Sequence, residues 1–447
     1  MTNPKHPRRP RGLRELNVGL PQTMVDTPAG LSQTCAELAA EPLIGFDTEF
    51  IGEDRHRPDL CLIQAATAKH LYLIDPLTVG PLDSFWQLLI DPNRTVVVHA
   101  GREEIRLCEQ HIGHPPAKVF DVQIAAGLVG LAFPLGHSAL IQQVLNLSVP
   151  KNETLTDWRR RPLTAQQIEY AYDDVRYLLP LYRLLSTRLS KLGRLDWVYQ
   201  ECAELCVRSV KDPPELERWR RLRGASSLDR QRLGVLRALF AWREEQAAQV
   251  NRPARTILRD DLLVELAKRN PQRPRDLQVL RGLPKLDFDQ LYAIIQQARD
   301  LPADLQPELM ETEADPPQFA LIASVLQAVL TDLCQRHKLA QSLVATAADI
   351  RQLLRVQLTN APPGDLPLLR GWRAEAVLPE LLAILRGQRA IYIRDSSSAN
   401  PLGYVDRLAQ ATTTHEPPPP ACVSPASAPP ASAALAPSES ADSPQPR

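Results

Sequence analysis

The sequence predicts an α/β domain followed by two all-helical modules, because strand and helix patterns alternate in its first part and only helical patterns follow. Over residues 42–122, short runs rich in β-branched and aromatic residues alternate with helical runs, which is typical of a mixed sheet covered by helices. Beyond Gly193 we find no convincing strand pattern, and apolar residues instead recur at helical spacing over residues 228–301 and 317–387. A chain of 447 residues is also too long for one ordinary hydrophobic core.

Composition sets the expected limits of these parts. Residues 301–317 are acidic and contain prolines, which predicts a linker. The C-terminal segment is rich in Pro, Ala and Ser, a composition that buries too little apolar surface to offset the entropy of ordering. We expect a basic flexible tail over residues 1–20, the α/β domain over 21–205, helical modules over 226–303 and 316–390, and a disordered tail over 396–447.

Cysteine usage and hydropathy indicate a reducing, aqueous compartment. The seven cysteines are scattered and odd in number, which argues against a disulfide framework. Cys202 and Cys206 lie in a helical pattern with no second pair nearby, so we interpret them as packing residues rather than zinc ligands. No stretch approaches the roughly 20 apolar residues of a membrane span, and the N-terminus lacks the apolar core of a signal peptide. We therefore expect a cytoplasmic protein.

The net charge does not indicate a nucleic-acid partner, since 52 basic residues balance 52 acidic ones. Arginines nevertheless gather in the N-terminal tail and in one later segment, and such clusters can neutralise phosphates. A solvated helical face explains the later cluster equally well. That cluster consists of Arg218, Arg220, Arg221, Arg223, Arg230, Arg232 and Arg237.

The run FDTEF is the strongest indication of chemistry. Residues two apart in a strand point to the same face, so Asp47 and Glu49 are expected to project side by side. Two such carboxylates repel each other unless a cation joins them, and hard ions such as Mg²⁺ or Mn²⁺ take oxygen ligands of this kind. Because the same pattern is common on exposed strands, this motif alone does not establish a metal site.

A second motif lies on a long helix expected from Thr164, its N-cap, to about Leu189. Tyr170 and Asp174 are four residues apart and therefore share one face of this helix. A phenol beside a carboxylate suits the positioning of water at a metal. Tyrosines that simply pack against the sheet are the alternative, and Asp173 lies within the same turn as a decoy.

The run TVVVHAGREEI predicts a strand that ends at His99, a glycine turn, and a helix that opens with Glu103 and Glu104. This arrangement would place acidic groups at the C-terminal end of the strand. Acidic residues also favour the first turn of any helix through its dipole, so the motif is the weakest of the three by itself. For His99 we favour a turn or packing role over catalysis.

Taken together, FDTEF, HAGREE with FDVQIA after it, and Y-x3-D near the end of an α/β unit resemble the tyrosine-bearing branch of the DEDD exonuclease superfamily. The likeness is greatest to the ribonuclease D family, and LIQAAT, LYLIDPL and KNETLTDWRRRPLTAQQIEYAYDDVRYLLPLY strengthen it. The helical stretch from about Leu228 resembles the HRDC domain shared by RecQ-type helicases and ribonuclease D. Residues 317–387, which include LLRGWRAE, look like a second such module.

The resemblance implies a ribonuclease-H-like fold and a 3′→5′ exoribonuclease with two divalent ions, Mg²⁺ or Mn²⁺. It implies that Asp47 bridges both ions, that Glu49 and Asp174 hold the ion carrying the attacking water, and that Tyr170 orients this water. The implied partner is RNA with a single-stranded 3′ end, such as a tRNA precursor, trimmed to 5′ nucleoside monophosphates. Nothing in the sequence demands more than a monomer.

One position departs from the family pattern. The second-motif carboxylate is normally Asp, and the matching position here, which the resemblance implies to be a metal ligand, is Glu104. The extra methylene adds roughly 1.5 Å of reach, so the second ion could be held in altered geometry or be a larger ion such as Mn²⁺. Glu103 and Asp121 remain alternative ligands. A non-catalytic RNA-binding scaffold is the competing function, and action on DNA is left open because it depends on contacts with the 2′-OH.

Overall fold

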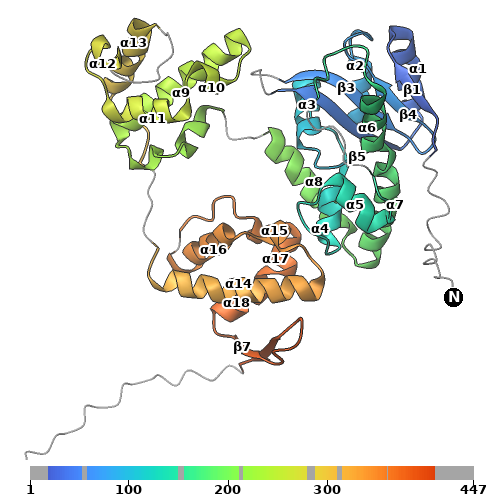
Figure 1. Ribbon diagram of the computed structural model, residues 1–447. Helices are drawn as coiled ribbons and strands as arrows, with labels where there is room; N and C mark the ends of the chain where they lie inside the picture. Colours follow the sequence, from blue (N-terminus) through green and yellow to red (C-terminus); the bar gives the residue numbers. More distant parts are fainter. Residues whose placement is uncertain are drawn as a thin grey trace, which may run out of the picture.

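The computed structural model describes residues 19–52, 58–149, 156–210, 215–278, 287–309, 315–359 and 361–407. The basic tail, apart from its last two residues, and residues 408–447, for which we expected flexibility and disorder, lie outside the described residues. The expected α/β domain followed by helical modules is confirmed (Figure 1).

Six strands form one mixed sheet in the order β1-β4-β3-β2-β5-β6, with β2 and β3 at its centre. β3 runs antiparallel to both β2 and β4, whereas the pairs β1–β4, β2–β5 and β5–β6 are parallel. The strands are β1 Gln22–Val25, β2 Leu43–Ile51, β3 Asp59–Ala66, β4 Leu71–Ile74, β5 Thr95–Val98 and β6 Val119–Asp121.

Helices cover both faces of this sheet. Phe46 of β2 packs against Phe85 and Trp86 of α2, with ring centroids 5.7 and 6.0 Å apart, whereas Gly45 faces Leu178 of α7. Because side chains alternate along a strand, Asp47 and Glu49 share the face of Gly45. The helices are α1 Pro28–Ala39, α2 Asp83–Leu89, α3 Arg102–Ile112, α4 Val122–Leu128, α5 His137–Leu145, α6 Ala165–Arg176, α7 Leu178–Lys191 and α8 Leu195–Val210.

The prediction of a single long helix from Thr164 is wrong, because the structure divides this segment into α6 and α7 at Tyr177. The expected start is confirmed: the Thr164 hydroxyl accepts from the Gln167 backbone N–H, and the Gln167 side chain accepts in return from the Thr164 N–H. Pro180 explains the division, since proline lacks an N–H and its ring clashes with the carbonyl four residues earlier.

The first helical module, residues 215–309 as described, has a hydrophobic core of its own. Trp219, Leu236, Phe240, Leu263 and Ile295 are among the buried residues of this core. Its elements are the 3₁₀ helices η2 Glu215–Arg221 and η3 Ala225–Ser227 and the helices α9 Arg230–Val250, α10 Ala254–Ile257, α11 Asp260–Arg269, α12 Pro274–Gln278 and α13 Phe288–Arg299.

The arginine cluster of this module is largely engaged within the protein. Arg220, Arg230 and Arg237 donate hydrogen bonds to carbonyl oxygens of residues 303–308 at 3.0–3.3 Å, and Arg232 pairs with Asp229, the N-cap of α9. The first part of the expected linker therefore lies against the module instead of spanning freely. A phosphate-binding role for these arginines would have to compete with those bonds.

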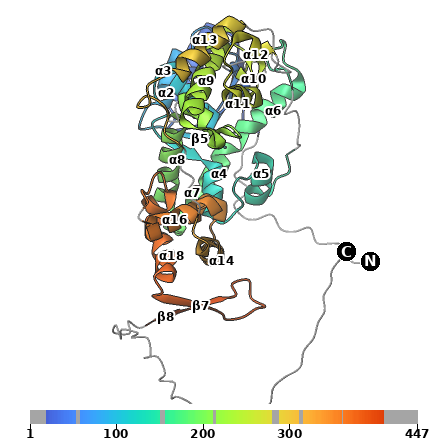
Figure 2. The same cartoon turned by 90° about the vertical axis from the view of Figure 1, so that its left-hand side faces the viewer.

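The C-terminal module, residues 315–407 as described, shares one hydrophobic core with the α/β domain. Figure 2 shows it beside the end of that domain where α4 and α7 lie. Its elements are α14 Gln318–His337, α15 Gln341–Val344, α16 Ala347–Thr359, the 3₁₀ helix η4 Pro367–Leu369, α17 Gly371–Ala376, α18 Leu378–Leu385, β7 Arg389–Ile393 and β8 Leu402–Asp406.

Two expectations for this module are wrong. The antiparallel hairpin β7–β8 follows the helices, although we expected no strand beyond Gly193, and β8 falls inside the segment from residue 396 that we expected to be disordered. The hairpin is held to the helices by Tyr404, whose hydroxyl donates to Asp332 at 2.7 Å.

Helix α14 is long and apolar enough to span a membrane by length and composition. Its buried residues, Leu326, Val329 and Leu330 among them, belong to the shared core.

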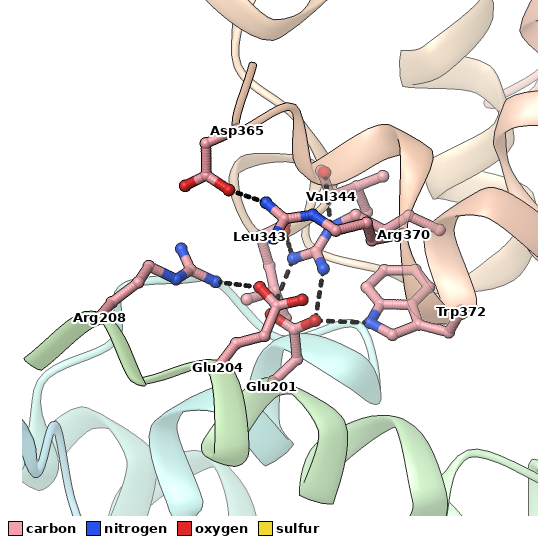
Figure 3. A network of polar contacts seen from close by, with 9 residues as sticks. Glu201, Glu204, Arg208, Leu343, Val344, Asp365, Arg370 and Trp372 are labelled. Carbon is pink, nitrogen blue, oxygen red and sulfur yellow. Dashed lines mark hydrogen bonds and ion pairs between the residues drawn. The ribbon is translucent and has the colours of Figure 1, made fainter. Parts of the chain in front are cut away.

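A buried ion pair fastens the C-terminal module to α8 (Figure 3). Both guanidinium Nη atoms of Arg373 donate to the carboxylate of Glu201, which also accepts from the Trp372 indole at 2.7 Å. The Arg373 and Glu201 side chains are only 5% and 4% exposed. The remaining donors of Arg373 reach the carbonyls of Leu343 and Val344 at 2.6 and 2.9 Å. Each nitrogen of the guanidinium therefore has an acceptor, and such hydrogen bonding is the condition under which a buried charge is tolerated.

We predict that Glu201→Gln lowers the free energy of unfolding of the unit formed by the α/β domain and the C-terminal module by about 3 kcal/mol, because it leaves the Arg373 charge buried without its partner. Glu204→Gln is the matched control on the same helix. Glu204 pairs with Arg208, whose side chain is 54% exposed, so that variant should cost under about 1 kcal/mol. Urea unfolding measures both variants, and equal losses would contradict the assignment.

Candidate active site

The three expected motifs meet around one cavity of about 330 Å³. β2 contributes Asp47 and Glu49, the first turn of α3 contributes Glu104, and α6 contributes Tyr170 and Asp174. The structure therefore brings together all five residues that the sequence nominated. The other lining residues are Thr48, Phe50, His99, Ala100, Glu103, His137 and Leu178.

The larger cavity, of about 610 Å³, lies elsewhere, between the turn before β6 and α8. Its lining includes His114, Lys118, Tyr199 and Cys206 but no carboxylate, and Lys118 lies over the Tyr199 ring. Its size does not make it the reaction site. We place the chemistry in the smaller cavity because the acidic groups gather there.

Glu104 is fixed from two sides. The Thr48 hydroxyl donates to its carboxylate at 2.8 Å, and Glu104 is only 6% exposed. The turn before α3 is held by Asp121, which accepts from the N–H groups of Ala100 and Gly101 at 3.2 and 3.0 Å. Only glycine fits at Gly101, because an added Cβ would lie 2.3 Å from a methyl group of Val98. This turn determines where the first residues of α3 point.

The structure distinguishes Glu104 from its two alternatives, Asp121 and Glu103, and Asp174 from its neighbour Asp173. Asp121 caps α4 and accepts four backbone N–H bonds, and it does not line the cavity. Glu103 does line the cavity, but its side chain is 39% exposed and pairs with Arg106 at 3.4 Å. Asp173 does not line the cavity and pairs with Arg176 at 2.6 Å. Of these three carboxylates, only Glu103 lines the cavity.

Burial and mutual repulsion disfavour negative charge on these carboxyl groups. Burial raises the pKa of Glu49 to about 9, with further repulsion from Asp47, Asp174 and Glu104. Burial and then Asp174 raise the pKa of Asp47 well above its usual range, and burial and then Asp47 do the same for Glu104. The pKa of Asp174 is raised to about 7 by burial and by Asp173, although a hydrogen bond from Tyr170 opposes the shift. A group of acids with this electrostatic cost is typical of a site that receives cations.

Nothing in the sequence indicates that His137 lies at the site, since a lone histidine after Pro134, Leu135 and Gly136 belongs to no recognisable motif. It is the first residue of α5 and lies with its Nδ1 3.8 Å from Asp174 Oδ1. Burial lowers the pKa of His137 to about 4, so the ring is neutral near pH 7. His99 lies beside it, with ring centroids 5.0 Å apart, and its Nε2 donates to the Leu135 carbonyl at 2.9 Å.

Comparisons with known proteins agree with this arrangement. A family described as 3'-5' exonuclease matches residues 22–190, and the HRDC domain family matches residues 232–298. Ribonuclease D of Gluconacetobacter diazotrophicus is 33% identical over 383 residues, which cover 84% of this chain and 96% of that protein. Ribonuclease D of Pseudomonas paraeruginosa is 35% identical over 361 residues, 80% of this chain and 96% of that protein.

Among solved structures, Escherichia coli RNase D, described as an exoribonuclease involved in structured RNA processing, superposes with a TM-score of 0.75. It is 30% identical, and the match covers 82% of this chain and 99% of that one. Such identity over most of both chains, with the carboxylates gathered in one cavity, leads to one conclusion: the chain belongs to the ribonuclease D family of hydrolytic 3′→5′ exoribonucleases.

Proposed function

We propose that this exoribonuclease trims the single-stranded 3′ ends of structured RNA, tRNA precursors among them, as a cytoplasmic monomer. The observation that carries the proposal is the gathering of Asp47, Glu49, Glu104 and Asp174 around one cavity in which burial and repulsion disfavour their charges. Enzymes of the DEDD superfamily depend on divalent metal ions. We propose two ions here, Mg²⁺ or Mn²⁺, which these four carboxylates would hold.

The donor set fits such ions by its chemistry. All four groups are carboxylate oxygens, the ligands that Mg²⁺ and Mn²⁺ prefer, and two bound dications would offset the repulsion among them. Within the described ranges, no three Asp, Glu, His or Cys side chains already converge tightly enough to enclose an ion. The fit therefore rests on the type and the grouping of the donors.

The side chains themselves supply orientation. The Thr48 hydroxyl holds the Glu104 carboxylate, and burial followed by the charges of Asp174 and Glu49 keeps the pKa of Tyr170 above its usual range. The phenol therefore remains protonated and can hold the attacking water on the face of α6 that carries Asp174. When bound, the ions would activate this water and stabilise the leaving 3′ oxygen.

Tyr170→Phe should lower kcat by about a hundredfold or more while the affinity for Mn²⁺ changes less than about twofold, because the phenol is proposed to touch water and not metal. Single-turnover hydrolysis and a metal titration followed by thermal unfolding measure the two effects separately. A large loss of metal affinity in this variant would count against the assigned role. Tyr172→Phe, on the same helix but outside the cavity lining, is the control.

The proposed activity is tested by digesting a 5′-labelled tRNA that carries a 3′ extension. With Mg²⁺ or Mn²⁺ we expect the extension to shorten one nucleotide at a time, with release of 5′ nucleoside monophosphates. Chelation by EDTA and the Asp47→Asn variant should each stop the reaction. A DNA oligonucleotide of the same sequence measures the preference for RNA, and internal cleavage or metal-independent turnover would contradict the proposal.

The proposed domain limits are those of the sequence with one extension. The exonuclease domain takes residues 21–205 and the HRDC domain takes 226–303. The second HRDC-like module begins at 316 and is extended from 390 to 407 to include the β7–β8 hairpin. We propose that the helical modules bind the body of the substrate through backbone phosphates, and that the catalytic cavity receives the single-stranded end.

A further inference from the structure

The C-terminal module contacts a turn of the catalytic domain that leads to the active site. The Ala340 N–H donates to the Gly127 carbonyl at 2.9 Å, and the Ser342 hydroxyl donates to the Phe133 carbonyl. Arg194, between α7 and α8, joins the two sides, since its guanidinium donates to the Leu128 carbonyl and to the carbonyls of residues 337 and 338. Residues 337–343 therefore hold the segment 127–133.

The same segment continues into one wall of the catalytic cavity. The Leu135 carbonyl accepts hydrogen bonds from His99 Nε2 at 2.9 Å and from Gln123 Nε2 at 3.0 Å. Gly136 is the N-cap of α5, and His137, the first residue of that helix, lines the cavity beside Asp174. The contacts of the module thus lie within a few residues of the groups that fix both histidines.

The approach of the two segments is close at Gly130. Its backbone has a φ of +91°, and an added Cβ would lie 2.9 Å from the Lys338 Cβ and 3.0 Å from the Lys338 carbonyl oxygen. The carbonyl oxygen belongs to the backbone and the Cβ is bonded directly to it, so neither atom can move aside as the end of a flexible side chain can. A displacement of residues 337–343 must therefore move the turn at residues 127–136 as well, because the close packing at Gly130 leaves no free space between the two segments.

We propose that the C-terminal module acts as a positioning element of the catalytic cavity: residues 337–343 hold the turn at 127–136, and this turn keeps His99 and His137 in place beside Asp174. The proposal deepens the proposed function and rests on it, because it assigns the module a part in turnover besides binding RNA. Ser342 and Arg194 are positioning residues in this scheme. Neither touches the reacting atoms.

Gly130→Ala in the full chain tests the proposal, and Gly113→Ala is its matched control. Both glycines have positive φ, +91° and +75°; Gly113 is the C-cap of α3, and Gly130 follows Val129, the C-cap of α4. No atom lies within 4 Å of a Cβ added at Gly113. The control therefore reports the strain of alanine at positive φ without the contact with Lys338. Lys338→Gly, at a residue with φ +52°, removes one of the two clashing atoms in the double variant.

We expect Gly130→Ala to lower kcat on a short single-stranded oligoribonucleotide by about tenfold to a hundredfold, with little change in KM, at a temperature where the protein is fully folded. Gly113→Ala should keep kcat within about twofold of the parent protein. Adding Lys338→Gly to Gly130→Ala should restore part of the loss, because the two changes act at one contact. Unchanged kcat in Gly130→Ala, or equal losses in both single variants, would overturn the proposal.

Hydrogen exchange gives a readout that does not depend on activity. In Gly130→Ala the amides of residues 131–140 should exchange faster than in the parent protein, and in Gly113→Ala they should not. If Gly130→Ala fails to fold, Ser342→Ala provides the same comparison, since it removes only the bond to the Phe133 carbonyl. An inactive parent protein would refute the proposed function, whereas an active parent with unchanged exchange over residues 131–140 would refute only the positioning role.

Discussion

Asp174→Asn is expected to lower kcat by at least about a thousandfold, or about 4 kcal/mol of transition-state stabilisation, while RNA binding survives. The residue lies on the cavity face of α6 beside Tyr170 and His137. Asparagine keeps the shape of the side chain but removes the charge proposed to hold a metal ion. Rapid-quench turnover with excess Mn²⁺ measures kcat, and a filter-binding assay with the same RNA measures affinity.

Asp173→Asn is the control for this variant, because Asp173 is the neighbouring carboxylate but pairs with Arg176 outside the cavity. We expect turnover within about threefold of the parent protein, since Asp173 does not line the cavity and Arg176 keeps its second ion pair, with Glu169 at 2.8 Å. Near-normal turnover in Asp174→Asn, or a larger loss in Asp173→Asn, would remove the two-metal assignment of this helix.

Asp174→Asn, which is expected to lower turnover, should not lower the stability of the protein when no metal is bound. The pKa of Asp174 is about 7 in the folded protein, whereas an unfolded Asp titrates near pH 4. Because the folded pKa is the higher one, the stability linked to this group is fully present below about pH 4 and is lost as pH rises through about 7. In EDTA at pH 8, Asp174→Asn should therefore unfold at the same or a higher urea concentration than the parent protein, and metal should stabilise the variant much less.

Glu104→Gln should lower kcat by about a hundredfold or more, since it removes a negative charge from the second-motif position. Glutamine has the same length as glutamate, so its side-chain oxygen can still accept from the Thr48 hydroxyl, which donates to Glu104 at 2.8 Å. The loss would therefore reflect charge more than folding. Turnover and the urea midpoint, measured on one preparation, separate the two.

Glu103→Gln is the matched control, because this side chain lies on the rim, 39% exposed and paired with Arg106. It should keep kcat within about threefold. Glu104→Asp should retain activity and shift the preferred ion from Mn²⁺ toward Mg²⁺, since it restores the shorter ligand usual in the superfamily. If Glu103→Gln were the inactive variant and Glu104→Gln the active one, the metal site would have to be redrawn around Glu103.

Local periodicity is enough to nominate most of this site from the sequence. Asp47 and Glu49 share a face because a strand repeats every two residues, and Tyr170 and Asp174 share a face because a helix turns about every 3.6 residues. The capping box at Thr164 is likewise a local pattern, and it places the start of α6 correctly. The alternation of strands and helices also predicts the α/β domain before the helical modules.

Tertiary structure alone decided which groups surround these carboxylates. Asp121 does not line the cavity, because its carboxylate accepts hydrogen bonds from the N–H groups of Ala100 and Gly101, about 20 residues away along the chain. His137 enters it through a turn that residues 337–343 hold from the C-terminal module. Likewise, Arg220, Arg230 and Arg237, which look free for phosphate in the sequence, are occupied by the backbone of residues 303–308. The physical reason is the same in each case: the direction of a side chain follows from its own strand or helix, whereas its partners come from segments that only the folded chain brings together.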